Sequence, residues 1–184
     1  LVLLTLSQAG CNIESTSEGA AAAPEDKSTT LITQAKAIHA SALTIDAHAD
    51  IEIPGKPSMY VGADGLSRVS PAKMHAGGLD AVVMSLAVGP MPRNPKGYAA
   101  AKALAQTKLA AVNALANDPV NNAIIVQTTE ELQTAQTEGK AALILGFQNA
   151  LILGTNTTGI DELYDSGVRV FALTHMGHNN FADS

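Results

Sequence analysis

The sequence predicts an α/β fold built around a parallel β-sheet, and three observations carry this prediction. Short apolar segments, typical of buried strands, alternate along the chain with longer segments of helical character. The strand segments are nearly continuous apolar runs, which is typical of strands covered on both faces. Their strict alternation with helices indicates right-handed strand–helix–strand units. The predicted strands are residues 43–50, 79–88, 123–126, 141–146 and 168–174.

The segments between these strands predict the helices. Residues 31–42 place apolar side chains near helical spacing, which predicts a short amphipathic helix before the first strand. Residues 97–117 are rich in Ala, Leu and Lys and form a helix without internal proline. Thr128 is the predicted N-cap of a helix that ends at Gly139, and residues 159–166 form a shorter one.

Two architectures fit this order of elements. One is a five-stranded doubly wound sheet, and the other is the first five strands of a (β/α)8 barrel. The folded domain is predicted to be residues 31–184. A closed barrel needs eight strands and about 250 residues, so the barrel is incomplete here. The local pattern fits both folds, and the residues at the strand ends must separate them.

Composition excludes several classes of protein. The formal net charge is -6, with 11 Lys and Arg against 17 Asp and Glu, and no basic cluster is present to neutralise nucleic-acid phosphates. The same balance argues against binding to anionic lipid by charge. A single cysteine excludes a disulfide framework and a multi-cysteine zinc site.

The first residues predict export. Residues 1–6 are apolar, too few to span a bilayer but typical of the end of a secretory signal. Residues 7–11 resemble the lipobox of bacterial lipoproteins, with Gln8 as a departure and Cys11 as the lipidated residue. Residues 1–11 are then a signal remnant, and residues 12–30 a flexible tether rich in Ser, Thr and Ala. We expect a periplasmic or membrane-anchored lipoprotein; an ordinary signal with an incidental cysteine is the alternative.

The end of the first strand carries the candidate metal ligands. Strand side chains alternate between faces, so Asp46, His48 and Asp50 are expected to project to the same side. His48 and Asp50 together offer a nitrogen and an oxygen, a mixed ligand set that suits zinc. Asp46 is expected one layer lower, where it would orient His48. The alternative is a polar strand end that faces solvent.

Two further strand ends carry polar side chains. Gln148 follows the apolar run 141–146, and His175 follows the last strand. Both candidate folds place functional groups beyond the carboxyl ends of their strands. His178 is expected in the following loop. His39 and His75, the latter in a predicted turn, are expected at the surface.

Taken in order, these segments resemble the membrane (renal) dipeptidase family of zinc peptidases. Residues 45–50 with Pro54 are similar to the family's opening strand, and residues 73–80 to its second strand entry. The closest similarity is Gly-Val-Arg-Val-Phe-Ala-Leu-Thr-His at residues 167–175, followed by Asn-Phe-Ala-Asp-Ser at the end of the chain. The resemblance covers residues 45–184.

The resemblance implies a (β/α)8 barrel with a two-zinc centre that hydrolyses dipeptides by a metal-activated water. By position, His48 and Asp50 are ligands of the first metal. His175 is the histidine that steadies the developing oxyanion. Gln148 stands where the family has a glutamate that bridges the metals. The remaining ligands and the proton-accepting aspartate fall beyond Ser184.

Gln148 alters the expected metal content. A bridging glutamate supplies a negative charge and two oxygens between the two cations. Glutamine offers one neutral oxygen, and its amide NH2 does not bind metal. We therefore expect one or two zinc ions, with the second bound weakly or not at all.

The sequence supports three functional hypotheses. The first is a metallodipeptidase that acts on a dipeptide or a small peptide-like substrate. The second is another metal-dependent amidohydrolase, disfavoured because such enzymes usually open with His-x-His. The third is a barrel lipoprotein that binds peptides without hydrolysing them, as Gln148 suggests. Besides the substrate, the hypothetical partners are the membrane, through a lipid anchor, and a second copy of the chain in a homodimer. No nucleic acid is expected as a partner.

Overall fold

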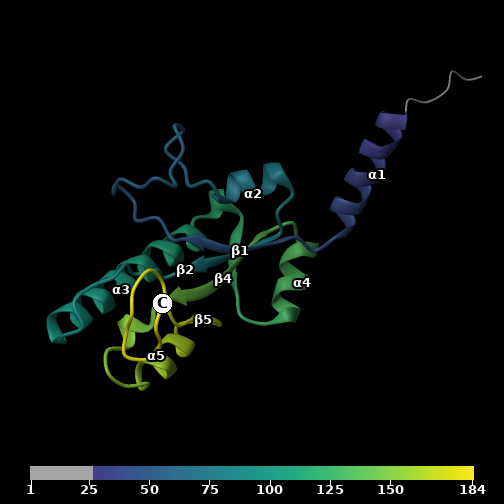
Figure 1. Cartoon of the computed structure of the whole chain (residues 1–184). Coiled ribbons are helices and arrows are strands. Elements are labelled where there is room, and N and C mark those ends of the chain that lie inside the picture. The colour runs from purple at the N-terminus through teal and green to yellow at the C-terminus, as the bar shows by residue number, and fades with distance from the viewer. Residues whose placement is uncertain (1–26) are drawn as a thin grey trace, which may run out of the picture. The chain divides into compact units, whose positions relative to one another are not determined.

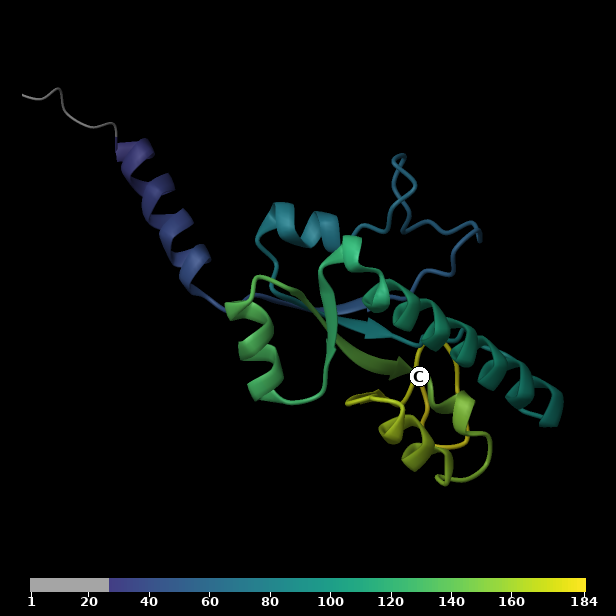
Figure 2. The same cartoon turned by 180° about the vertical axis from the view of Figure 1, so that it is seen from behind.

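The computed structural model describes residues 27–184, whose centre is a sheet of five parallel strands (Figure 1). The strands and the helices against them belong to one compact unit, residues 37–184. The strands are β1 (Ile45–Asp50), β2 (Ala81–Ser85), β3 (Ala123–Val126), β4 (Ala141–Gln148) and β5 (Val170–Ala172). All five predicted strands are therefore present. The arrowheads of β1, β2 and β4 point to the same edge of the sheet in both views (Figures 1 and 2).

The strand order is β1–β2–β4–β3, with β5 also paired to β4, so β3 does not lie between β2 and β4. β2 pairs with β1 on one side and with residues 142–146 of β4 on the other. β3 pairs with residues 141–144 of β4, and β5 pairs with residues 146–148. Because β2 occupies one edge of β4, β3 and β5 share its second edge. The continuous wall is thus β1–β2–β4–β5, and β3 is an added strand along the first half of β4.

The helices also follow the predicted order, with one addition. They are α1 (Lys27–Ser41), α2 (Pro71–Gly77), α3 (Pro95–Asn117), α4 (Thr129–Thr137) and α5 (Gly159–Asp165), with 3-10 turns at Pro119–Asn121 and Ala150–Leu153. Thr128 caps α4 as predicted, through a capping box with Glu131. The segment of α2 was expected to be a turn, and that expectation is wrong. Pro71 starts this helix and Gly78, with φ 68°, ends it within two turns, which is too short for a periodic pattern.

α1 begins four residues earlier than the predicted helix, so residues 27–30 of the predicted tether are helical. None of its residues is buried, and Leu31 and Ile38 are 64% and 68% exposed. Its apolar side chains thus make no core within the described residues. The predicted signal remnant, Cys11 and the rest of the tether lie outside the described part of the chain.

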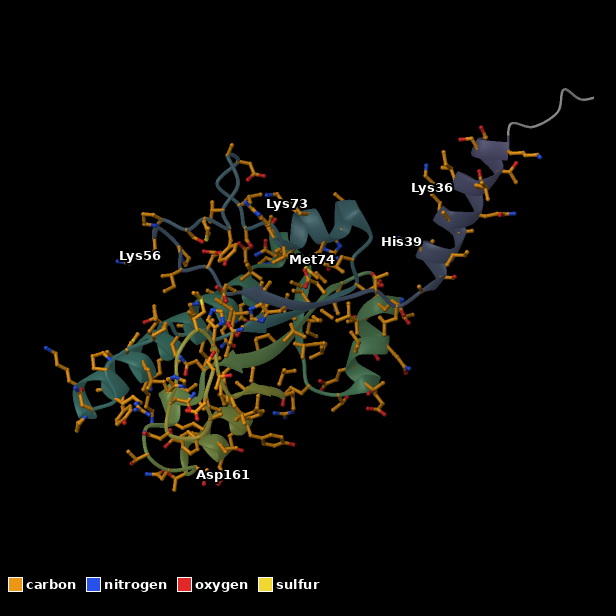
Figure 3. All side chains as sticks on the ribbon, viewed as in Figure 1. Lys36, His39, Lys56, Lys73, Met74 and Asp161 are labelled. Atoms are coloured by element: carbon orange, nitrogen blue, oxygen red, sulfur yellow. The ribbon has the colours of Figure 1, made fainter. Side chains whose placement is uncertain are left out.

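The main core lies between one face of the sheet and α3. Alternate residues of β2 and β4 point into it, and Phe147 meets Phe171 of β5 edge to face at 4.9 Å. Met74 of α2 is also buried in this core, whereas Lys36 and His39 of α1 are exposed (Figure 3). The main contributors from the central strands are Val82, Met84, Leu86, Leu143, Leu145 and Phe147.

The opposite face of the sheet is divided along the strands. Near the amino ends, Leu132 and Ala135 of α4 pack against Ala81 and Ala142 in a second, smaller cluster. Toward the carboxyl ends, the same face carries the small or polar residues Ser85, Gly146 and Gln148, because side chains alternate along each strand. α4 therefore covers the amino end of this face, and its polar positions lie at the carboxyl end.

Candidate metal-binding site

The last residues of β1 deviate from a regular strand. The pairing register between β1 and β2 shifts between Asp46 and Ala49, where an extra residue is accommodated. The Asp46 carboxylate accepts a hydrogen bond from the backbone N–H of His48 at 3.0 Å. The regular alternation that predicted one shared face is therefore interrupted, and Asp46 holds the main chain of His48 instead of its imidazole.

Beyond this irregularity, the side chains of His48 and Asp50 face each other. Nε2 of His48 lies 3.7 Å from Oδ1 of Asp50, which is too long for a hydrogen bond. That carboxylate oxygen is buried and has no hydrogen-bond partner among the described residues. Two ligands at zinc distances and a tetrahedral angle are separated by about 3.3 Å. The pair therefore fits a shared cation better than a direct contact.

An open cleft of about 230 Å3 borders this pair. Its other wall is formed by the loop before α2, which contributes Tyr60 and Arg68. The backbone of this loop is tied by a single bridge between Val61 and Ser67. The two candidate ligands are thus accessible from solvent, with side chains 46% and 28% exposed.

Several polar groups near this site were not predicted from the sequence. Ser85 is paired in register with Asp50, is 2% exposed, and its hydroxyl has no partner among the described residues. Oε1 of Glu52 is likewise buried without a partner. Burial lowers the pKa of Lys108 on α3, while the charges of Asp50 and Glu52 act to raise it. No sequence motif marks these residues, because their proximity depends on strand pairing.

The end of β4 places Gln148 on the face that carries Ser85. Ser85 is in register with Gly146, so the residue two positions later projects to the same side. The Gln148 side chain is half-buried and makes no hydrogen bond within the described residues. Among the described residues, the Gln148 amide therefore has no hydrogen-bond partner that would compete with a ligand at this edge of the sheet.

His175 follows β5 by three residues and is half-buried. The parallel pairing of β4 and β5 puts it at the same edge of the sheet as the ends of β1 and β4. His178 lies in the loop after β5, as predicted, where it is exposed and its Nδ1 lies 3.1 Å from a carboxylate oxygen of Asp183. His39 and His75 are also exposed, in agreement with their predicted surface positions.

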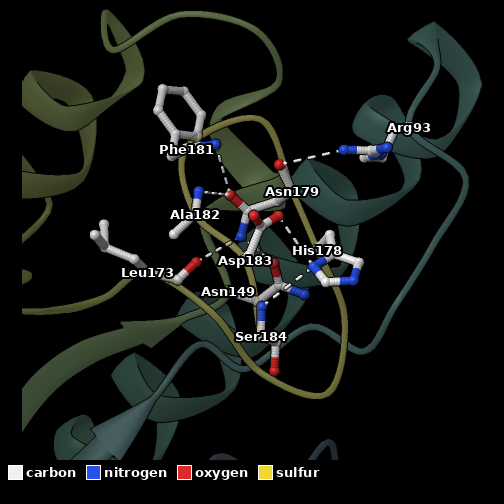
Figure 4. A network of polar contacts seen from close by, with 9 residues as sticks. All are labelled: Arg93, Asn149, Leu173, His178, Asn179, Phe181, Ala182, Asp183 and Ser184. Carbon is white, nitrogen blue, oxygen red and sulfur yellow. Dashed lines mark hydrogen bonds and ion pairs between the residues drawn. The ribbon is translucent and has the colours of Figure 1, made fainter.

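Two buried asparagines fix the segments that follow β4 and β5 (Figure 4). Asn149 donates to the carbonyl of Val88 and accepts from Asn179. Asn179 also donates to the carbonyl of Leu173 and accepts from the backbone of Phe181 and Ala182. The chain around His175 is held at both ends by this network, which the sequence did not reveal.

Within residues 27–184, no three His, Cys, Asp or Glu side chains converge on one point. His48 and Asp50 make two ligands, and a bound ion would need others. The donor set of one imidazole and one carboxylate suits zinc. Among the described helices, none has the length and apolar character needed to cross a bilayer.

The family comparison identifies the chain. The family model for membrane dipeptidases (peptidase family M19) matches residues 32–184. The chain belongs to this family. The match covers every strand of the sheet together with His48, Asp50 and His175. No curated protein sequence matches the chain.

Solved structures agree with family membership in their fold. The probable dipeptidase PvdM from Pseudomonas aeruginosa has a TM-score of 0.74 at 22% identity, over 85% of this chain and 40% of its own. The dipeptidase AC, a metallo peptidase, has a TM-score of 0.58 at 16% identity, over 73% of this chain and 45% of its own. A metallo peptidase from Rhodobacter sphaeroides, liganded with a phosphinate mimic of the dipeptide L-Ala-D-Ala, has a TM-score of 0.53 at 14% identity, over 66% and 42%.

The chain therefore spans less than half the length of each of these structures. The sheet corresponds to the first part of a (β/α)8 barrel, as the resemblance implied, and the doubly wound alternative is excluded. The fold differs from the expected five consecutive strands in one respect: β2 pairs directly with β4, and β3 lies on the far side of β4 and not between the two.

Proposed function

We propose that the protein containing this chain is a metal-dependent dipeptidase. The observation that carries the proposal is the pairing of His48 and Asp50 at the carboxyl end of β1, in a member of the membrane dipeptidase family. The relative from Rhodobacter sphaeroides was liganded with a mimic of a dipeptide, which supports substrates of this size. In barrels of this kind, the reacting groups gather at the carboxyl ends of the strands.

The metal would be held on this half of the barrel by Nε2 of His48 and Oδ1 of Asp50. The unpartnered, buried oxygen of Asp50 fits this role, because a buried carboxylate oxygen without a partner is costly unless a cation binds to it. Bound zinc would supply an acidified water and polarise the scissile carbonyl. Asp46 fixes the backbone of His48 and so limits the orientations of the imidazole.

His175 is the residue we assign to the substrate carbonyl. A protonated ring nitrogen at this edge would donate a hydrogen bond to the oxygen that becomes negative as the peptide bond is attacked. The hydrogen bonds of Asn179 hold the segment after β5 and keep the histidine near the sheet edge. We assign no residue of this chain to the transfer of the proton to the leaving amine.

Metal content and hydrolysis of the full-length protein test the proposal together. The wild-type protein should bind zinc and cleave an unsubstituted dipeptide such as L-Ala-D-Ala. His48→Ala and Asp50→Asn should each lower zinc affinity by about 10-fold or more and abolish cleavage. An enzyme that cleaves dipeptides equally well after exhaustive chelation, or with both residues replaced, would overturn it.

A second candidate function is peptide binding without hydrolysis, and Gln148 favours it. With no charge at this position, a second cation lacks a bridging ligand and the site is weaker than the family resemblance implies.

The variant Gln148→Glu separates these two functions. For an impaired site, it should raise the zinc content from one toward two ions per chain and increase dipeptide turnover by about 10-fold or more. Metal analysis and a turnover assay of the full-length protein provide the readouts. A wild-type enzyme that is already fully active with one zinc per chain, and gains nothing from the glutamate, contradicts the impaired-site idea.

We also propose that the protein is exported and anchored through a lipid on Cys11, as its first eleven residues suggest. Radiolabelled palmitate should enter the wild-type protein in bacterial cells and should not enter Cys11→Ser. Equal labelling of both proteins would refute the anchor. A homodimer remains a proposal that sedimentation of the full-length protein can test.

A further inference from the structure

The cleft beside His48 and Asp50 has a second wall to which the proposed function assigns no role. This wall belongs to the loop before α2, residues 51–70, whose residues at the cleft are Tyr60, Ser67, Arg68 and Val69. The cleft has a volume of about 230 Å3, so a molecule that lies beside the two candidate metal ligands also lies beside this loop. Side chains of the loop are therefore placed to contact the substrate.

Backbone hydrogen bonds give this wall a defined shape. The N–H of Arg68 donates to the carbonyl of Tyr60 at 3.0 Å, and the N–H of Gly62 donates to the carbonyl of Leu66 at 2.9 Å. Arg68 and Tyr60 therefore face each other across the base of a short hairpin, and both line the cleft. A wall that is already ordered loses little conformational entropy when a ligand binds to it.

The guanidinium of Arg68 has unused hydrogen-bond donors. Of its five N–H groups, one makes a hydrogen bond within residues 27–184, from Nη2 to the carbonyl of Met59 at 3.3 Å. No carboxylate in the described part of the chain forms an ion pair with it. Arg169, in contrast, donates to three oxygen atoms and lies 3.8 Å from the ring centre of Tyr164. Arg68 is thus a cation at the cleft that can still bind an anion.

A carboxylate is the anion that fits this position in a peptide substrate. Guanidinium groups bind carboxylates through two parallel hydrogen bonds, and this geometry distinguishes them from a lysine ammonium. One residue of an extended peptide spans about 3.5 Å. A peptide carbonyl beside His48 and Asp50 and a carboxylate beside Arg68 can therefore belong to one dipeptide within a cleft of this size.

We propose that Arg68 is a specificity-determining residue that binds a carboxylate of the substrate. The inference rests on the proposed function and deepens it, because it names the chemical group that this side of the cleft selects. Two carboxylates of a dipeptide have the required chemistry, the one at its carboxyl terminus and the one of an acidic side chain. The experiment below separates these two sources.

Hydrolysis of four related dipeptides by the full-length protein tests the role of Arg68. L-Ala-D-Ala and L-Ala-D-Gln carry one carboxylate each, L-Ala-D-Glu carries two, and L-Ala-D-alaninamide carries none. Arg68→Met keeps the length of the side chain and removes its charge and donors. The measured quantity is KM, or the inhibition constant of a peptide that is not cleaved.

Each source of the carboxylate predicts its own pattern. For the terminal carboxylate, Arg68→Met should raise the constants of the three acids by about 10- to 100-fold and leave that of the amide unchanged. For a side-chain carboxylate, the rise should be confined to L-Ala-D-Glu, with L-Ala-D-Gln as its neutral counterpart. In both cases kcat should change little, because the lost contact is made equally in the ground state and the transition state.

Two further variants serve as rescue and control. Arg68→Lys should recover part of the affinity, since lysine keeps the charge and loses the paired donors. Lys56→Met removes a positive charge from the same loop, but Lys56 is exposed and does not line the cleft (Figure 3). It should leave all four constants unchanged. A purely structural Arg68 would lower the unfolding temperature on replacement and weaken the four peptides alike.

The outcomes are separable from those of the proposed function. If the wild-type protein cleaves dipeptides and Arg68→Met changes none of the four constants, or all of them equally, the role of Arg68 is refuted and the dipeptidase proposal survives. If the wild type binds these peptides without cleaving them, the dipeptidase proposal fails, and dissociation constants from calorimetry replace KM in the same comparison. If it neither cleaves nor binds any of them, both fail.

Discussion

Asn179 connects segments that are distant in the sequence through a single buried amide. Its side chain makes four hydrogen bonds, two as donor and two as acceptor, and the residue is 4% exposed. Each partner is a backbone group or the side chain of Asn149, so no water is needed to satisfy them. These hydrogen bonds of the Asn179 amide hold the loop that carries His175 in place.

Replacing Asn179 by alanine should therefore destabilise the full-length protein by about 2–4 kcal/mol, because several buried polar groups lose their partners. Urea denaturation provides the measurement. Asn180→Ala is the matched control. Asn180 donates to the Tyr98 hydroxyl and the Gly154 carbonyl but is exposed, so its loss should cost less than about 1 kcal/mol. Equal losses for the two variants would contradict this account of Asn179.

At the scale of residues, the sequence could indicate His48, Asp50 and His175 because they form part of short patterns at strand ends. It could not indicate Ser85 or Asn149. Their importance depends on which strand lies beside which, and on whether a polar atom finds a partner after folding. It also could not show that Asp46 binds a backbone amide, because that contact depends on a local irregularity of β1.

The start of α3 depends on a glycine in its first turn. The Asn94 side chain accepts from the backbone N–H of Gly97 and caps the helix. A Cβ atom at residue 97 would lie 1.8 Å from the carbonyl oxygen of Pro92 and 2.9 Å from its carbon. Both atoms belong to the backbone, so the turn would have to move to accept any side chain.

Gly97→Ala should accordingly cost about 1–3 kcal/mol in the unfolding free energy of the full-length protein. Gly77→Ala is the matched substitution in α2, where a Cβ would meet no atom within 4 Å and φ is not positive. It should stabilise by about 0.4–1 kcal/mol through the unfolded chain. Thermal unfolding of both variants compares them, and a Gly97→Ala protein as stable as wild type would rule out the steric argument.

At the scale of elements, the predicted strands and long helices are present because apolar runs and propensity act locally. Strand bounds differ by a few residues, since pairing partners decide where a strand ends. α2 could not be predicted as a helix from seven residues. The position of β3 along half of β4 depends on long-range pairing, which the order of elements does not contain.

The sheet of residues 27–184 has three strands with a free edge, β1, β3 and β5, and the edges of β1 and β5 are those that further barrel strands would meet. β1 pairs with β2 alone and β5 with β4 alone among the described strands. Apolar side chains near these edges are exposed, including Ile45 at 46%, Val170 at 40% and Leu173 at 52%. In a barrel, both edges and these side chains would be covered by further strands.

Residues 27–184 produced alone should therefore lack a sharp thermal transition and bind a hydrophobic dye. The full-length protein, under the same conditions, should unfold cooperatively and bind little dye. Calorimetry and dye fluorescence measure both. A cooperative transition of the isolated residues, with native-like near-ultraviolet dichroism, would show that the four-stranded wall is stable without the rest of a barrel.

The segment between α3 and β4, which contains β3 and α4, offers a site for labelling the protein. The 3-10 turn before β3 lies at the amino edge of the parallel sheet, opposite the strand ends that carry His48 and His175, and its Val120 is 88% exposed. Exposed turns of this kind tolerate insertions. A fluorophore or affinity tag introduced there offers a means to follow the protein during purification and imaging without occupying the mouth of the cleft.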